Sequence, residues 1–177
     1  MPTKVRKLRL FEALELRSEY DARLKTLSEC LPEKHENRGR MLFHDDEVVN
    51  RPARGFDIVK VREEIGALEQ KRRDLNAAIQ ETNFHNTIEL DANSISLAAA
   101  LDLRKALNTK IGELHSMVTS SAWERVIYKE GRDIVRESHL DFAMCVAELD
   151  RVRHAFRELN RKLRTASFEL EVDFRDE

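Results

Sequence analysis

The stretch LFEALELRSEYDARLKTL, residues 10–27, has a pattern that recurs later in the chain and predicts how the protein is built. LAAALDLRKALNTKIGEL, residues 97–114, matches it at an offset of 87 residues, and the register pairs Leu16 with Leu103 and Arg17 with Arg104. Apolar residues in both stretches recur at three- and four-residue steps, the spacing that places them on one face of a helix. Both stretches are therefore predicted to be amphipathic helices of one design.

A second pair of matching segments follows in the same order. FDIVKVREEI, from Phe56, matches LDFAMCVAEL, from Leu140, at an offset of 84 residues, which pairs Asp57 with Asp141. Two long matches in one order predict an internal duplication, over residues 8–91 and 95–174. Asp57 and Asp141 each precede a helical pattern, as Ser96 does, so all three are predicted to cap helix N-termini.

These repeats predict a mainly α fold with four long antiparallel helices in two duplicated helical hairpins, each followed by a short β-strand. The first helix is expected over about residues 4–31, and the others carry apolar stripes over residues 58–79, 97–118 and 142–166. The stripes hold for about three heptads, which is typical of coiled-coil-like packing.

Short strands are expected where the apolar spacing changes to every second residue. Ile88 and Leu90 follow the second helix, and FELEVDF, residues 168–174, ends the fourth. Long loops, residues 31–55 and 119–139, join the helices of each hairpin, and Ile134 and Val135 form a strand in the second loop. A strand needs a partner, either in the same chain or in a neighbouring subunit, and both alternatives stay open here.

The composition favours one soluble domain, residues 1–177, in the cytoplasm. Charged residues make up 36% and hydrophobic residues 41% of the chain, as expected for partly solvated amphipathic helices. The charges of 31 basic and 33 acidic residues nearly cancel, so the net charge does not favour binding to nucleic acid or to a membrane. Apolar runs such as Leu97 to Leu101 are far shorter than the ~20 residues that span a bilayer, and Glu12 and Glu15 interrupt any signal sequence.

No motif of a known catalytic class occurs in the sequence. It has no phosphate-binding glycine loop, no nucleophile elbow and no paired cysteine or histidine spacing for a metal. His44 to Glu47 is the densest set of potential metal ligands, but adjacent residues seldom converge on one ion. His85 has no nucleophile placed to use it. We therefore expect no catalytic residue, no metal and no cofactor; a metal-dependent enzyme built on the His44 loop is the third interpretation.

Two arginines that recur across the duplication are the first candidate site. Arg17 and Arg104 fall in the apolar stripes, and Glu15 and Asp102 stand two residues before them. A guanidinium on an apolar stripe needs a carboxylate or carbonyl partner, because its desolvation is otherwise costly. The pattern fits either ion pairs between helices or subunits, or an anion site lined by the two arginines.

Four more arginines lie close to one edge of the fourth helix and are candidates for contact with nucleic acid. These are Arg153, Arg157, Arg161 and Arg164. Glu148, Asp150 and Glu158 interleave with them, a pattern that is also typical of a solvated helix face.

Several blocks, in order over Leu8 to Leu170, are similar to the septicolysin-like family of small bacterial proteins. They are EALELR, ETNFHNTIELDANSISLAAALDLRKAL, RDIVRESHLD and ELNRKLR. The resemblance implies a helical protein that forms homo-oligomers, with a hexamer among the assemblies it suggests. The chain departs from the family in the loop from Leu31 to Gly55 and in its FELEVDF end. A cytolysin is not supported by these residues, since no membrane-length run is present.

The leading interpretation is a non-enzymatic, self-assembling helical protein with a structural or interaction role. The alternative is a nucleic-acid-associated or anion-binding accessory protein that uses the helix arginines. A homo-oligomer is the expected partner, nucleic acid is kept as an alternative partner, and no membrane partner is expected.

Overall fold

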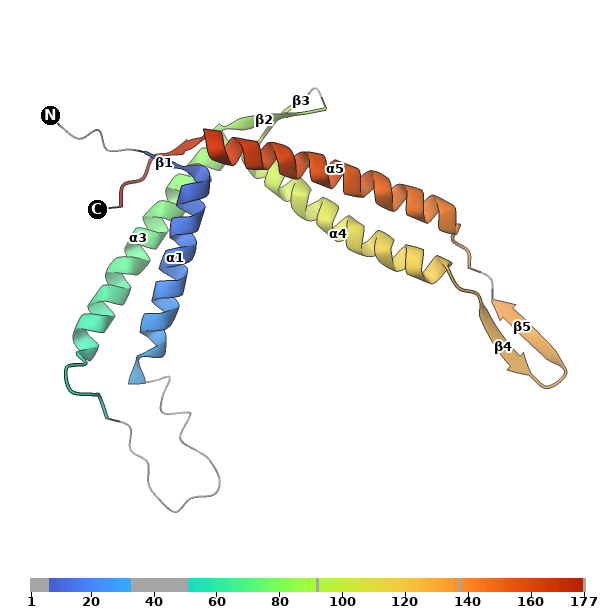
Figure 1. The fold of residues 1–177 in the computed structure, drawn as a ribbon, viewed down its shortest axis with the longest axis horizontal. Helices are drawn as coiled ribbons and strands as arrows, with labels where there is room; N and C mark the ends of the chain where they lie inside the picture. The colour runs from blue at the N-terminus through green and yellow to red at the C-terminus, as the bar shows by residue number, and fades with distance from the viewer. Residues whose placement is uncertain (1–6, 33–50, 92, 137, 177) are drawn as a thin grey trace, which may run out of the picture. The chain divides into compact units, whose positions relative to one another are not determined.

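A computed structural model of the chain describes residues 7–32, 51–91, 93–136 and 138–176. In these ranges the protein is mainly helical, with four helices and short antiparallel strands (Figure 1). The predicted class is confirmed at this level. The elements in chain order are β1 (Leu8–Arg9), α1 (Leu10–Glu29), α3 (Ile58–His85), β2 (Thr87–Leu90), β3 (Asn93–Ser96), α4 (Leu97–Ser121), β4 (Arg125–Lys129), β5 (Arg132–Arg136), α5 (Phe142–Glu169) and β6 (Glu171–Val172).

The chain divides into two compact units. Unit 1 comprises Met1–Thr82 together with Phe168–Glu177, and unit 2 comprises Asn83–Ser167. The C-terminal segment therefore belongs with the N-terminal helices. The single domain of residues 1–177 that the sequence predicts stays a prediction.

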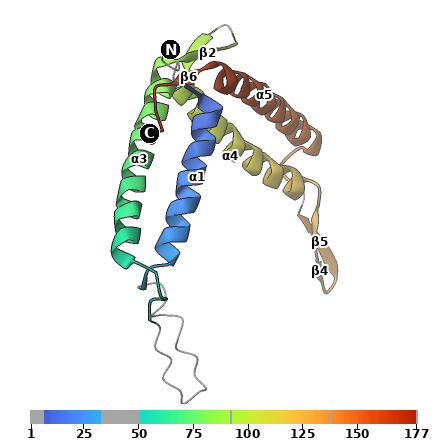
Figure 2. The same ribbon diagram turned by 60° about the vertical axis from the view of Figure 1, so that its left-hand side comes forward.

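In unit 1, α1 and α3 lie side by side (Figures 1 and 2). Asp21 pairs with Arg72 at 2.8 Å and Arg23 pairs with Glu64, so residue numbers fall along α3 as they rise along α1. The apolar stripes predicted from the sequence supply the buried side chains. Those of unit 1 include Leu10, Ala13, Tyr20, Leu24, Leu68, Leu75 and Ile79.

The C-terminal segment is joined to the start of α1. β1 pairs with β6 in antiparallel register, Leu8 opposite Val172, and the Leu10 amide donates to the Leu170 carbonyl at 2.9 Å. The rings of Phe11 and Phe168 lie 4.6 Å apart between centroids. The strand at the C-terminus therefore finds its partner within the chain.

Two predicted boundaries differ from the structure around this contact. The first helix begins at Leu10, because Leu8 and Arg9 are extended and pair with β6; Lys4 lies outside the described residues. The predicted strand of residues 168–174 is shorter, because α5 continues to Glu169 and only Glu171–Val172 form β6. Phe168 stays helical, with its ring against Phe11.

In unit 2, α4 and α5 pack along their apolar stripes. Leu114 of α4 is buried with Leu149 and Val152 of α5. The partly buried residues against this cluster are Leu107, Ile111, Met117 and Val118. The apolar spacing read from the sequence thus marks the side of each helix that is buried.

The β2–β3 hairpin connects α3 to α4. Ile88 stands opposite Ile95, and Asp91 has a left-handed backbone with φ of 49°, which aspartate tolerates in a tight turn. The Leu97 amide donates to the Asn86 carbonyl at 2.9 Å. The predicted strand at Ile88 and Leu90 is confirmed, and its partner is the next segment of the same chain; the sequence did not predict β3.

A second hairpin, β4–β5, lies between α4 and α5. Val126 stands opposite Val135 and Ile127 opposite Ile134, which confirms the strand predicted at Ile134 and Val135. Gly131 in the turn has φ of 88°, a conformation that glycine adopts without the steric cost of a side chain. The pairing is again within the chain.

The predicted helix caps are confirmed. Asp57 Oδ1 accepts from the amides of Val59 at 3.0 Å and Lys60 at 3.2 Å. Asp141 Oδ1 accepts from the Met144 amide at 2.8 Å, and Ser96 Oγ accepts from the Ala99 amide at 3.1 Å. Each satisfies a backbone donor that has no partner inside its helix.

Candidate functional site

A groove between α1 and α3 gathers polar side chains of unit 1. We call it the arginine groove; it has a volume of about 300 Å³ and is lined by Arg17, Asp21, Arg72, Arg73 and Asn76. Arg17 and Asp21 are one turn apart on α1, and Arg72 and Asn76 are one turn apart on α3, so two helix faces meet there.

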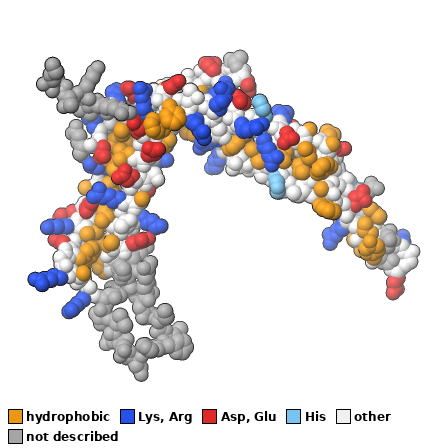
Figure 3. All heavy atoms as spheres, viewed as in Figure 1, with side chains coloured by type: hydrophobic (Ala, Val, Ile, Leu, Met, Phe, Trp, Pro, Cys, Tyr) orange, Lys and Arg blue, Asp and Glu red, His pale blue; other side chains and the backbone are white. Residues whose placement is uncertain are grey.

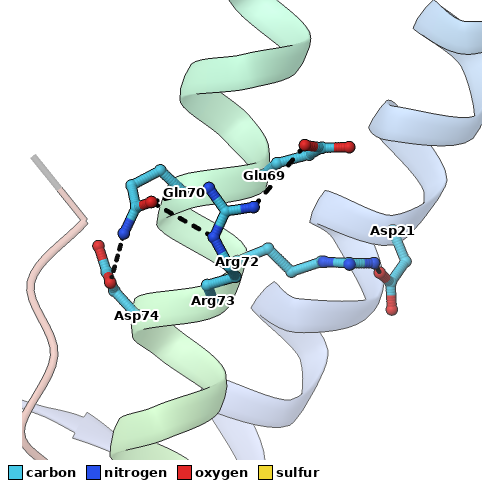
Figure 4. Close-up of polar contacts among 6 residues, drawn as sticks. All are labelled: Asp21, Glu69, Gln70, Arg72, Arg73 and Asp74. Atoms are coloured by element: carbon cyan, nitrogen blue, oxygen red, sulfur yellow. Dashed lines mark hydrogen bonds and ion pairs between the residues drawn. The ribbon is translucent and has the colours of Figure 1, made fainter.

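The two neighbouring arginines of α3 extend in different directions (Figure 4). Arg72 reaches across to α1, where its Nη1 lies 2.8 Å from Asp21 Oδ1. Arg73 stays along α3, with its Nη2 2.7 Å from Gln70 Oε1 and its Nη1 3.7 Å from Glu69 Oε2. Gln70 in turn donates to Asp74 at 2.8 Å. These contacts hold both guanidinium groups at the groove.

Arg17 is held less strongly. It is half-buried, and its Nη1 donates to Asn76 Oδ1 at 3.4 Å, which is long for a hydrogen bond and goes to an uncharged oxygen. A guanidinium carries five N–H donors, so this contact occupies a small part of its capacity.

The other members of the first predicted site lie elsewhere. Glu15 is exposed on α1, and Arg104 and Asp102 are exposed on α4. Arg17 belongs to unit 1 and Arg104 to unit 2, so a site shared by the two arginines stays a prediction. Arg72 and Arg73 were not among the predicted site residues, although Arg72 fills a slot in its apolar stripe as Arg17 does.

The four predicted nucleic-acid contacts are all exposed on α5. Two of them meet acids one turn earlier on the same helix: Arg153 lies 3.7 Å from Asp150 and Arg161 lies 2.8 Å from Glu158. The hydrogen bond from Arg161 lowers the pKa of Glu158. Two of the acids that interleave with these arginines in the sequence thus pair with them, and contact with nucleic acid stays a prediction.

An exposed apolar face on the β4–β5 hairpin was not predicted. We call it the hairpin surface; it comprises Val126, Tyr128 and Val135 together with Trp123, which lies two residues before β4, and Trp123 is 81% and Tyr128 80% exposed. Val126 and Val135 are cross-strand partners, and Tyr128, two residues from Val126, points to the same side of the ribbon. Figure 3 shows hydrophobic side chains continuing from the start of α5 onto this hairpin. The sequence signal was the alternation of Val126 and Tyr128 beside the predicted strand.

The C-terminal segment ends in a second polar contact. The buried Tyr20 hydroxyl donates to Asp176 Oδ1 at 2.5 Å, and Lys71 Nζ lies 3.2 Å from the same oxygen. Burial and the Asp176 carboxylate raise the pKa of Tyr20 well above its ordinary value. The hydrogen bond from Tyr20 and the nearby Lys71 lower the pKa of Asp176. The hydroxyl of Tyr20 therefore stays protonated and is not activated as a nucleophile. The contact joins α1 to the C-terminal segment.

The predicted metal loop cannot be placed among these sites, because His44 to Glu47 lie outside the described residues. Within the described ranges, no three histidine, cysteine or acidic side chains are grouped as a metal site would need. His85 is the last residue of α3. In the same part of the chain, no helix is long and apolar enough to cross a membrane.

Comparisons with known proteins identify a related fold. No protein-family model matches the chain, and no curated protein matches it in sequence. A solved structure, described as that of a functionally unknown conserved protein from Corynebacterium diphtheriae, is similar with a TM-score of 0.68 and 18% identity. The match covers 95% of this chain and 100% of that one. At this identity the likeness shows the fold alone, and the resemblance to the septicolysin-like family stays a prediction.

Proposed function

We propose that this protein is a non-enzymatic, self-assembling helical protein, and that the hairpin surface is where copies of the chain meet. The observation that carries the proposal is the exposure of large apolar side chains on an isolated two-stranded ribbon. Val135 is 51% exposed, in addition to Trp123 and Tyr128.

A two-stranded ribbon of this kind has little stability of its own in water. In the part of the chain that the structure describes, β4 and β5 pair with each other and with no third strand, so each has one edge of backbone N–H and C=O groups without a strand partner. Ile127, on the opposite side of the ribbon from Val126, is also 38% exposed, so apolar side chains meet water on both sides. Contact with another surface would bury this apolar area, and each Å² removed from water would stabilise the contact by about 25 cal/mol.

A second copy of the chain fits this edge. In an antiparallel copy centred between Ile134 and Val135, these two apolar residues face each other across the contact. A two-fold axis satisfies both chains with one contact.

The subunit that assembles is proposed to consist of two duplicated helical hairpins, each followed by a short strand. Three observations support this: β2 follows α3 as β6 follows α5, Asp57 and Asp141 cap the matching helices, and the offset of 84 residues pairs Asn76 with Asn160. The cytoplasmic location stays a prediction.

Light scattering on a sizing column tests the assembly. We expect the wild-type protein to have a mass that is a multiple of 20.7 kDa and that falls on dilution. The double substitution Trp123→Lys and Tyr128→Lys should give a monomer, because charges would have to be buried in the contact. Both positions are highly exposed, so the variant should fold, and circular dichroism checks this.

The matched control is Val59→Lys, which places a lysine at an exposed apolar position of α3 in unit 1. We expect it to assemble as the wild type does. A wild-type protein that is monomeric at every concentration, or a double variant that assembles normally, would contradict the proposal.

A further inference from the structure

We propose that the arginine groove is a binding site for a compact dianion of the phosphate class, either inorganic phosphate or the phosphate group of a small phosphorylated molecule. This is a function of unit 1 and is independent of the self-assembly proposed for the hairpin.

The charge of the groove favours an anion with two charges. Its lining carries three guanidinium groups against the single carboxylate of Asp21. Among the described residues, Arg72 uses Nη1 on Asp21 and Arg17 contacts Asn76 at 3.4 Å, which leaves N–H donors of both arginines for a ligand. The planar fork of arginine matches the oxygens of phosphate in a bidentate manner.

The groove is also built to present these donors from two sides. Arg17 comes from α1 and contacts Asn76 of α3, whereas Arg72 comes from α3 and is oriented across the gap by Asp21 of α1. An oriented arginine loses less conformational freedom when it binds, which strengthens binding.

The surroundings of the groove distinguish a small ligand from a nucleic acid. Its volume of about 300 Å³ is at the lower end of small-molecule sites. Glu64, Glu69 and Asp74 of α3 lie beyond its lining, and a long polyanion that followed the helix would meet these carboxylates. A compact dianion avoids them.

Unit 2 does not repeat the site. In the register of the duplication, the positions of Arg72 and Arg73 correspond to Phe156 and Arg157, which line a different groove with Asp150 and Arg153. An aromatic ring replaces the guanidinium that reaches across in unit 1. We therefore expect one anion per chain.

Calorimetric titration of the full chain with inorganic phosphate, at constant ionic strength in chloride, tests the site. We expect saturable binding of one equivalent. Arg17→Ala should weaken it about tenfold or more, because a hydrogen bond to a charged group is lost, and Arg72→Ala should act in the same direction. Arg17→Lys should recover part of the affinity, since it keeps the charge but not the fork.

The matched control is Arg23→Ala. Arg23 also joins α1 to α3, through Glu64, but does not line the groove, so we expect phosphate affinity within about twofold of wild type. Circular dichroism establishes that each variant is folded.

Parallel titrations with glycerol phosphate and a single-stranded oligonucleotide separate the sources of the phosphate group. Tighter binding of the ester identifies a phosphorylated small molecule, and equal binding identifies free phosphate; both support the site. The proposal is overturned if phosphate does not saturate, if two equivalents bind, if Arg17→Ala and Arg72→Ala bind as the wild type does, or if only the oligonucleotide binds.

Discussion

Tyr20 is the residue whose role depends most on its surroundings. Its side chain falls in the apolar stripe of α1 and is 6% exposed, yet its hydroxyl reaches Asp176 near the C-terminus. A buried hydroxyl without a partner would be costly, so the bond to Asp176 is what permits this burial. Lys71 adds a second contact to the same carboxylate.

Replacing Tyr20 by phenylalanine removes this bond and leaves the ring. We expect the free energy of unfolding to fall by about 1–2 kcal/mol, because the acceptor is charged, as measured by urea denaturation. Tyr128→Phe is the control, since that side chain is 80% exposed and the change should stay within about 0.5 kcal/mol.

The same contact predicts a pH dependence. Because the pKa of Asp176 is lowered on folding, its contribution to stability is present above the unfolded value of about 3.9 and is lost as the pH falls through the folded value. Because the pKa of Tyr20 is raised, its contribution is present below about pH 10 and is lost at higher pH. The difference in melting temperature between wild type and Asp176→Asn should therefore be largest near neutral pH and shrink below about pH 4. A difference that is constant with pH would contradict this.

At the scale of elements, the short strand β6 is the contact that was hardest to foresee. It is two residues long, yet Val172 is fully buried, and the strand pairs with Leu8 and Arg9 at the other end of the chain. Arg9 also donates to the Glu169 carbonyl and its amide donates to Glu12 at 2.7 Å, so the start of α1 and the end of α5 are held by one residue.

Val172→Ala should lower the free energy of unfolding by about 2 kcal/mol, through lost burial of two methyl groups and the cavity left behind. The measurement is again urea denaturation. Val59→Ala is the control, because that valine is 64% exposed and the change should be near zero. If the two variants are equally stable, β6 does not contribute to the folded state in the way its burial indicates.

At the scale of the whole molecule, the chain has a set of buried residues in each unit. The cluster of Leu114, Leu149 and Val152 belongs to unit 2, whereas Leu75 and Ile79 belong to unit 1. Proteins open locally in cooperative units, so a substitution in one set of buried residues should first loosen the helices that pack around that set. Amide hydrogen exchange detects such local opening.

Leu149→Ala, which removes a buried leucine at a cost of about 2–5 kcal/mol, tests this. We expect faster amide exchange along α4 and α5 and little change along α1. Leu103→Ala, at an exposed position of α4, should leave exchange unchanged. A uniform rise along the whole chain would instead mean one cooperative domain, as the sequence predicts.

The candidate sites were only partly predictable. Arg17 was found because a charged residue on an apolar stripe is conspicuous. Its groove could not be predicted, because Arg72 lies about 50 residues from Asp21 in the chain and no local spacing relates the two helices. The hairpin surface was missed because a strand of alternating residues reads as half-buried. Only the structure shows that both sides of that ribbon carry exposed apolar residues.

The features that depend on near neighbours in the chain could be read from the amino-acid sequence. Apolar spacing marked the helices and their buried faces, and Asp57, Ser96 and Asp141 marked where three of them begin, because a cap acts within one turn. The tertiary structure alone decided which distant segments meet: β1 with β6, Tyr20 with Asp176, and Arg72 with Asp21. Those contacts depend on how the chain closes on itself, which no periodicity of 2 or 3.6 residues encodes.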